Sequence, residues 1–521
     1  MIDYSFFVPY NGSAYRWEVL MRKKEAGILL HVSSLPNKYG IGTFGKDAFD
    51  FIDFLNKSNL RVWQILPLTL TSFGDSPYQS PSSKGLNPYF IDFEILEEEG
   101  LLLKKEYENI DWGDNPRKVN YSSIFENKMK VLQIAFKRFN RSDKDFEKFV
   151  ESKDYLDFSV FMSAKEINDL KPWYEWKEEF KVFSEKVEKN IINNYKDKVL
   201  FYEWTQYEFL KQYNSLRNYA KSKNVKIMGD IPIYVAYDSV EVWKNPELFQ
   251  LNDNHIPTKV AGCPPDCFTT DGQLWGNPLY NWDFMKTNNY EWWSKRIDYS
   301  LKLYDYLRID HFRGFSGYYA IPYGDKTARN GKWIKGPGFD LFKDKLDYPI
   351  VAEDLGQLDD DFYEMMNKVS YPGMKVAIQG FDGDPNSIWK PSNYTYNFFS
   401  YTGTHDSQTT RQFIDELTPS QKAIFISDLK KECIHFNINF NEKGQNDYLT
   451  MKLCEINYLS ASRCAICPMQ DLLAIGEEGR MNFPSTISDK NWSWRSVKED
   501  YSNSLSEFIS NLMDKSNRDI D

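Results

Sequence analysis

Short, uniformly apolar runs recur along the chain, and several end in a polar or charged residue followed by a turn. Runs of this kind are typical of strands buried on both faces, as in a parallel sheet. Eight such runs alternate mostly with helix-like stretches such as residues 47–58. The pattern predicts an α/β fold, a (β/α)8 TIM barrel. The predicted strands are Gly27–His31, Arg61–Pro67, Val225–Asp230, Tyr306–Asp310, Tyr348–Glu353, Met374–Ile378, Phe398–Tyr401 and Cys464–Pro468.

The intervals between the predicted strands are unequal. Roughly 150 residues, many of them charged and helix-favouring, separate the second and third strands, far more than one crossover helix needs. A segment rich in Pro, Gly and Asn, Ala261–Trp282, separates the third and fourth strands. We interpret both intervals as large insertions, between barrel strands 2–3 and 3–4. The predicted division is an N-terminal extension over 1–20 and one catalytic barrel over 21–521, with a mainly helical insert at about 75–215 and a cleft-side insert at about 238–290.

Composition narrows the class of protein. Hydrophobic residues make up 41% of the chain, yet no run approaches the roughly 20 apolar residues that a membrane span needs. Residues 1–20 lack the basic and apolar blocks of a secretory signal, so we expect a cytoplasmic protein. The net charge of −11 argues against a nucleic-acid partner, because phosphate binding requires a basic face.

Aromatic residues and cysteines change this picture only slightly. Aromatics make up 17% of the chain, which is compatible with stacking on sugar rings but is explained mostly by core packing. Among the six cysteines, the pairs Cys263/Cys267 and Cys464/Cys467 have a spacing that zinc sites use. The second pair lies in an apolar run, where cysteine is an ordinary small hydrophobic residue. We therefore expect neither a zinc site nor disulfides.

Carboxylates follow four of the predicted strands. Asp230, Asp310 and Glu353 end a strand, and Asp406 comes after a short turn. The carboxyl ends of barrel strands meet at one rim, where active sites are built. One carboxylate there is equally well explained as a salt bridge or a helix cap. Four that converge would repel one another, and such clusters usually serve catalysis or bind a cation.

The segment Arg308–Gly314 places a cation beside one of these acids. Arg308 and Asp310 are two residues apart and therefore share one face of a strand. The guanidinium would orient Asp310 and keep it ionised, as a nucleophile requires, although an Arg–Asp pair that only holds a loop has the same spacing. Glu353 ends an apolar strand, where partial burial would raise its pKa toward that of a general acid. Its neighbour Asp354 is interpreted as a turn cap.

Histidines are concentrated at the same rim. Three of the five, His31, His311 and His405, lie at predicted strand ends. This bias favours polar roles in the active site over buried structural roles. His405 and Asp406 together would bind sugar hydroxyls and stabilise charge that develops on the ring.

Several short segments, taken together in their order along the chain, indicate which family the sequence resembles. Three carry the candidate acids: Arg308–Gly314, Ala352–Gly356 and Gly403–Asp406. The others are Gly27–Pro36, Asp75–Ser80, Gly229–Val235, Pro264–Asp266, Gly272–Tyr280 and Arg480–Asn482. Together they resemble the signature segments of the amylomaltases, or 4-α-glucanotransferases, which form glycoside hydrolase family 77 and are relatives of the α-amylases. The resemblance covers the chain from Gly27 to about Arg495.

By position, the resemblance implies that Asp310 is the nucleophile, Glu353 the general acid/base and Asp406 a stabiliser of the transition state. It implies a flexible loop beside the cleft at Cys263–Trp275, in which Cys267 replaces an aromatic residue found in some members. It implies no cofactor and no metal. The residues implied to bind substrate, with Tyr78 stacking on the donor sugar, are Tyr78, Asp230, Gln273, Trp275, Arg308, His311, His405 and Asn482.

The implied reaction transfers α-1,4-glucan segments between maltodextrins, with maltooligosaccharides as donors and acceptors and glucose as a further acceptor. The double displacement of the family retains configuration, which predicts that the Asp310 and Glu353 carboxyl groups lie about 5–5.5 Å apart. A retaining hydrolase of the α-amylase class is the alternative. A glucan-binding protein without activity is a second alternative, but it would be expected to lose at least one catalytic acid. A metal-dependent enzyme is a third, but the chain has no loop with calcium-site spacing. Chain-length preference and oligomeric state are not fixed by the sequence.

Overall fold

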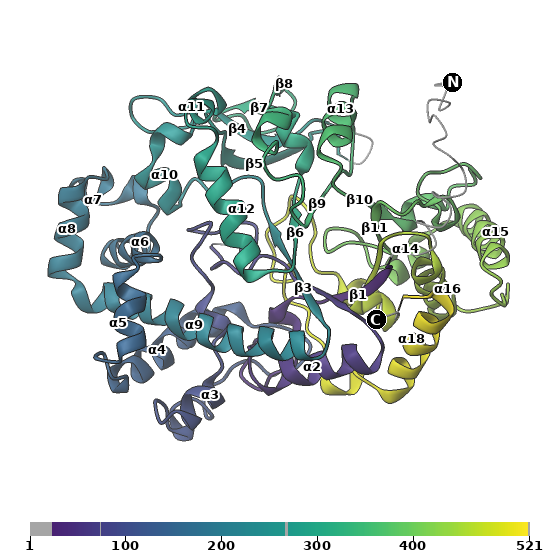
Figure 1. Ribbon diagram of the computed structural model, residues 1–521, viewed down its shortest axis with the longest axis horizontal. Helices are drawn as coiled ribbons and strands as arrows, with labels where there is room; N and C mark the ends of the chain where they lie inside the picture. Colours follow the sequence, from purple (N-terminus) through teal and green to yellow (C-terminus); the bar gives the residue numbers. More distant parts are fainter. Residues whose placement is uncertain (1–22, 73, 266–268, 519–521) are drawn as a thin grey trace.

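Eight parallel strands form one sheet that curls into a barrel in the computed structural model, which describes residues 23–72, 74–265 and 269–518 (Figure 1). The strand order is β10-β11-β12-β1-β2-β3-β6-β9. The end strands come together, because the Ala352 amide donates to the carbonyl oxygen of Pro372, 2.9 Å away. The predicted barrel is confirmed, with strand ends shifted by at most three residues: β1 (Glu25–Leu29), β2 (Val62–Gln64), β3 (Lys226–Ile231), β6 (Tyr306–Ile309), β9 (Ile350–Ala352), β10 (Gly373–Val376), β11 (Phe398–Tyr401) and β12 (Cys464–Pro468).

The barrel strands lie between a filled interior and an outer layer of helices. Every residue of β1, β2, β9 and β12 is buried, as expected for such strands. Gly27 in β1 permits a close approach to β2, since a side-chain carbon there would lie 2.2 Å from the Val62 carbonyl oxygen. Cys464 and Cys467 are buried in β12, so the interpretation of this segment as a buried strand is confirmed.

α-Helices lie between most consecutive barrel strands, although the described connections from β6 to β9 and from β10 to β11 contain none, and they extend to both ends of the molecule. In Figure 1 the helices between β2 and β3 gather at the left and α14–α16 at the right. The helices are α2 (Lys46–Lys57), α3 (Phe93–Glu98), α4 (Tyr121–Arg138), α5 (Lys144–Glu151), α6 (Leu156–Ile167), α7 (Glu178–Lys181), α8 (Glu185–Asn194), α9 (Lys196–Ser222), α10 (Val240–Lys244), α11 (Trp282–Thr287), α12 (Glu291–Leu303), α13 (Asp360–Val369), α14 (Thr410–Glu416), α15 (Pro419–His435), α16 (Asn446–Leu459), α17 (Met469–Leu472) and α18 (Asn503–Ser516).

A second, antiparallel sheet lies at the top of the view in Figure 1, in the order β5-β4-β7-β8. Strands β4 (Lys259–Cys263) and β5 (Gln273–Pro278) lie between β3 and β6, in the segment that the sequence marks as rich in Pro, Gly and Asn. Strands β7 (Gly317–Pro322) and β8 (Lys332–Lys335) lie between β6 and β9, a connection in which the sequence predicted no insertion. The division of the chain into one barrel domain with two inserts stays a prediction.

Candidate active site

Three of the candidate acids lie on neighbouring barrel strands. Asp230 is in β3, Asp310 follows β6 and Glu353 follows β9, and these strands are adjacent in the sheet. Backbone hydrogen bonds continue at the strand ends, where the Asp310 amide donates to Ile231 (3.0 Å) and the Glu353 amide donates to Ile309 (3.1 Å). The three carboxylates therefore come together at the carboxyl end of the barrel.

A buried guanidinium bridges two of these acids. Arg308 in β6 places Nη1 2.6 Å from Oδ2 of Asp230 and Nη2 2.8 Å from Oδ1 of Asp310. Burial alone would lower the pKa of Arg308, but the two carboxylates outweigh burial and hold it well above its usual range. The cation is therefore permanent, and it fixes the orientation of the Asp310 carboxylate.

Only one of the two carboxylate oxygens of Asp230 has a hydrogen-bond partner among the described residues. The Tyr78 hydroxyl donates to Oδ2 over 2.7 Å, whereas Oδ1 is buried and has no hydrogen-bond partner within the described part of the chain. Burial raises the pKa of Asp230, and Arg308 opposes that shift. A buried acceptor without a donor is costly, so Oδ1 is suited to receive a ligand hydroxyl.

Glu353 is placed for proton transfer. Its Oε2 accepts a hydrogen bond from the His311 amide (2.7 Å), and its Oε1 accepts one from the Leu355 amide (2.8 Å). Burial, and then the neighbouring Asp310 carboxylate, raise the pKa of Glu353 to about 8, although Arg308 and both amides oppose the shift. Near neutral pH the group therefore holds a proton, as a general acid must.

His311 links this acid to the second sheet. Its backbone is left-handed, with φ 50°, which directs its amide toward Glu353. The ring packs edge to face against Trp275 of β5, 4.9 Å between centroids, and the Trp275 indole N–H donates to Oε1 of Gln273 (3.0 Å). Burial lowers the pKa of His311 to about 4, so the imidazole is neutral. Its Nε2 is buried without a partner among the described residues.

The fourth acid lies in the loop after β11. Asn482 donates from Nδ2 to Oδ1 of Asp406 (2.7 Å), and Nε2 of His405 lies 3.2 Å from Oδ2. Partial desolvation favours the neutral acid, although 48% of the side chain is exposed, and His405 and Asn482 favour the carboxylate more, so the pKa of Asp406 lies well below its usual range. Burial likewise lowers the pKa of His405, and the Asp406 carboxylate outweighs it. Asp406 is therefore a stable anion, and Arg308, which contacts Asp230 and Asp310, also favours its ionised form.

The predicted stacking residue Tyr78 is already packed on one side. Its ring stacks on His405, with centroids 5.1 Å apart and planes 12° apart. Trp492 completes this group of rings, 5.8 Å from Tyr78 and 6.1 Å from His405. No local pattern indicates a role for Trp492, because it lies in a loop far along the chain from both partners.

A buried carboxylate holds the loop that carries Asp406. Asp471 in α17 accepts hydrogen bonds from the Thr402 hydroxyl (2.6 Å), the Thr410 amide (2.7 Å) and the Thr410 hydroxyl (2.8 Å). Both ends of segment 403–409 are therefore attached to one side chain, which is fully buried. No local pattern indicates a role for Asp471, since its partners Thr402 and Thr410 are 69 and 61 residues away along the chain.

The described residues include His31 and Asp354, for which the sequence made predictions, but not Cys267. His31 is buried and neutral: its Nδ1 accepts from the Leu66 amide (3.2 Å), and burial lowers its pKa to about 3. The interpretation of Asp354 as a turn cap is wrong, because its Oδ1 accepts from the Met374 amide (2.6 Å) and so joins the end of β9 to β10. Cys267 lies outside the described residues, so the missing stacking contact stays a prediction.

The sequence predicts that no metal is bound and that a flexible loop lies beside the cleft. Within the described ranges, no group of three or more His, Cys, Asp or Glu side chains is arranged to hold a metal ion. The predicted flexible loop, Cys263–Trp275, begins at the last residue of β4 and ends inside β5, so its ends belong to paired strands.

Known proteins resemble this chain over nearly its whole length. The sequence profile of the 4-alpha-glucanotransferase family matches residues 30–499. A 4-alpha-glucanotransferase of Clostridium butyricum is 45% identical over 93% of this chain and 98% of its own. One from Streptococcus pneumoniae is 40% identical over 94% and 97%.

Solved structures agree with this match. An amylomaltase from Streptococcus agalactiae in complex with acarbose superposes with a TM-score of 0.89 at 41% identity, over 95% of this chain and 100% of the other. An amylomaltase from Corynebacterium glutamicum, at 17% identity, has a TM-score of 0.76 over 97% of this chain and 77% of its own, and therefore shares the fold.

Proposed function

This chain belongs to the 4-alpha-glucanotransferase family, and on that premise we propose how its strand-end residues transfer α-1,4-glucan segments. The observation that carries the proposal is the pairing of two unlike carboxyl groups on adjacent strands. Asp310 is bound by a permanent cation, and Glu353 is buried with a pKa of about 8. Environments that separate two acids in this way assign one to nucleophilic attack and the other to proton transfer.

In the first step, Glu353 donates its proton to the glycosidic oxygen while the Asp310 carboxylate attacks the anomeric carbon. The bond from that carbon to the leaving sugar breaks, and a covalent glucosyl-enzyme forms. In the second step, an acceptor hydroxyl gives its proton to the Glu353 carboxylate and attacks the same carbon, which releases Asp310. Two inversions retain the configuration. The carboxyl separation of about 5–5.5 Å is part of this proposal.

The remaining candidate residues bind the sugar and the developing charge. Asp406, a stable anion, would stabilise the positive charge at the ring in the transition state. Asp230 offers the unsatisfied Oδ1 to a sugar hydroxyl, and His311 offers the unsatisfied Nε2. The other residues proposed to contact substrate are Tyr78, Gln273, Trp275, Arg308, His405 and Asn482.

Transfer is distinguished from hydrolysis by the products formed from maltotriose. We expect glucose and longer maltodextrins at a constant number of reducing ends, since an acceptor sugar replaces water at the intermediate. A hydrolase of the α-amylase class would instead increase the reducing ends. Asp310→Asn and Glu353→Gln should each abolish turnover without loss of the folded state. A variant of either residue that keeps wild-type turnover would refute the assignment.

We also propose substrates and a cellular location for this chain. Maltooligosaccharides would serve as donors and acceptors, and glucose as an acceptor. No helix in the part of the chain that the structure covers has the length and apolar character needed to cross a bilayer. Cys433, Cys454, Cys464 and Cys467 are buried, and none of these four forms a disulfide, which is typical of a reducing compartment and supports a cytoplasmic location.

A further inference from the structure

One tryptophan is exposed at the edge of the second sheet. Trp333 in β8 keeps 39% of its surface accessible, and no other tryptophan of the described residues belongs to the exposed large hydrophobics. Strand β8 pairs with β7 on one side only, so the ring lies at an open edge. An exposed aromatic ring at a strand edge is able to stack on the face of a ligand.

The side chains of Arg313 and Tyr319 hold the Trp333 indole in place. The Arg313 guanidinium lies 3.8 Å from the ring centroid and covers one face, while the Tyr319 ring packs near its edge at 5.3 Å. Arg313 is itself fixed, because Nη1 and Nη2 both lie within 3.1 Å of Oδ2 of Asp359. The partly exposed indole is therefore preordered, and stacking a ligand on it costs little additional side-chain entropy.

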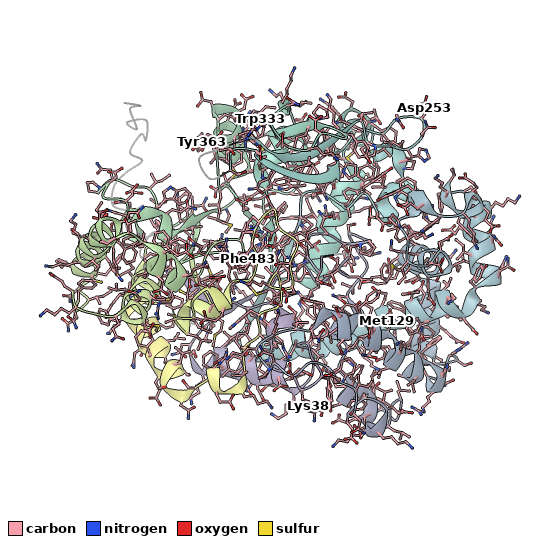
Figure 2. All side chains as sticks on the ribbon, turned by 180° about the vertical axis from the view of Figure 1, so that it is seen from behind. Lys38, Met129, Asp253, Trp333, Tyr363 and Phe483 are labelled. Carbon is pink, nitrogen blue, oxygen red and sulfur yellow. The ribbon has the colours of Figure 1, made fainter. Side chains whose placement is uncertain are left out.

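A second exposed ring lies close to this support. Tyr363 in α13 is 52% exposed, and its amide donates to the carbonyl of Asp359, one helical turn away (3.1 Å). Between the two elements, Lys335 Nζ of β8 lies 3.7 Å from Oδ2 of Asp361, and both side chains are largely exposed. Figure 2 shows Trp333 and Tyr363 together at the upper edge of the view. We call these two rings the Trp333–Tyr363 platform.

The platform is continuous with the catalytic end of the barrel. Arg313, which supports the indole, is three residues after Asp310, and Asp359, which holds Arg313, is six residues after Glu353. The supporting residues are thus extensions of two catalytic strand ends. A chain bound on the platform would lie at the same end of the barrel as the cleft.

We propose that the Trp333–Tyr363 platform binds a segment of α-1,4-glucan outside the catalytic cleft. The proposal rests on the proposed function, since the ligand is the polymeric form of the same substrate. The C–H groups of a sugar face carry partial positive charge and suit the negative face of an aromatic ring. Lys335 and Asp361 offer a donor and an acceptor to the hydroxyls at the sugar edge. Two separate rings between charged groups are a poor match to a protein partner, which needs a larger apolar core.

The test compares a short ligand with a polymer. Maltotriose reaches only the cleft, whereas amylopectin reaches the cleft and the platform together. Binding is measured with the Glu353→Gln variant as background, so that neither ligand is consumed: maltotriose by calorimetry and amylopectin by retardation in native gels. Trp333→Ala and Tyr363→Ala are introduced separately. Ile434→Ala, which removes an exposed apolar side chain on α15, is the matched control.

We expect Trp333→Ala to weaken amylopectin binding by about five- to tenfold, the size of one lost aromatic contact, and to leave maltotriose binding within about twofold. Tyr363→Ala should also weaken amylopectin binding. Because this variant keeps the contact between Arg313 and Trp333, it tests the proposal even if Trp333→Ala does not fold. Unchanged amylopectin binding in both variants would overturn the proposal. So would equal losses for both ligands, because the rings would then act through the cleft. Failure of the transferase assignment would appear separately, as absent turnover of maltotriose by the wild type.

Discussion

At the scale of single residues, the Glu353 carboxyl group couples folding to pH. Its pKa is raised from 4.5 to about 8, chiefly by burial. Between these values the folded chain holds a proton that the unfolded chain has released. The stabilisation is therefore complete below about pH 4.5 and is lost as pH rises through 8, by at most about 1.4 kcal/mol per pH unit.

Glu353→Gln should remove this dependence, because glutamine resembles the protonated acid and cannot ionise. We expect the variant to gain stability relative to the wild type as pH increases from 5 to 8, although it is inactive. Urea unfolding at several pH values measures the difference in unfolding free energy. Glu126→Gln, at an exposed position of α4, is the control and should show no such trend. A pH-independent difference for Glu353→Gln would contradict the prediction.

Arg308 is expected to resist conservative replacement. Its two terminal nitrogens contact different carboxylates, those of Asp230 and Asp310, and a lysine ammonium cannot reproduce this fork. Losing one charge-assisted contact should lower kcat/KM for maltotriose by about 10–100-fold. Arg138→Lys, at an exposed pair with Glu106, is the control. Full activity of Arg308→Lys would show that charge alone is sufficient.

The residues that sequence analysis selected differ from those it missed in where their partners lie. Arg308 and Asp310 are two positions apart in one strand, so their contact could be predicted from spacing. Trp492 and Asp471 act through side chains from distant parts of the chain, and no local pattern marks them. The left-handed backbone of His311, which directs an amide to Glu353, was equally hidden.

At the scale of elements, the short helix α17 determines the position of the Asp406 loop. Asp471→Ala would leave the buried Thr402 hydroxyl and the Thr410 amide without their acceptor. We expect a loss of about 2–4 kcal/mol in unfolding free energy, and a decrease in kcat well below the melting temperature because Asp406 is no longer held in place. Thermal melts and maltotriose kinetics measure both effects.

Asp471→Asn separates the two consequences of losing Asp471. Its amide oxygen can still accept from the backbone, so we expect partial recovery of both stability and kcat. Glu477→Ala, at a nearby exposed position, should change neither. If Asp471→Ala melted early but kept the wild-type kcat at low temperature, the helix would stabilise the fold without positioning Asp406.

The elements that could be predicted are those whose burial is uniform. All residues of β12 and β1 are buried, so each appears in the sequence as an apolar run. Strand β8 has the sequence Lys-Trp-Ile-Lys with mostly exposed side chains, and its pairing with β7 depends on tertiary contacts. The sequence therefore placed β4 and β5 in an insertion without strands, and it did not indicate β7 or β8.

At the scale of the whole molecule, the two ends of the described chain stabilise each other. Helix α18 packs on α2, where Ser58 and Ser506 share a hydrogen bond of 3.1 Å. Just beyond α18, Arg518 is fully buried and donates to three carbonyl oxygens, those of Glu25 in β1 (2.6 Å), Tyr458 (2.6 Å) and Ser460 (2.7 Å). The first barrel strand therefore depends on the last described residue.

Arg518→Ala should destabilise the entire barrel rather than the terminal helix alone. Three buried carbonyl groups would lose their donor, at about 1–3 kcal/mol for each unsatisfied group, and nothing nearby replaces the planar fork of the guanidinium. We expect a single cooperative unfolding transition shifted to lower temperature, with kcat on maltotriose unchanged below it, because the residue lies away from the catalytic acids. Calorimetry measures the shift, and Lys515→Ala, at an exposed position of α18, should leave the melting temperature unchanged. A separate early transition, with the main one unaffected, would mean that the C-terminal helix only covers a barrel that is stable without it.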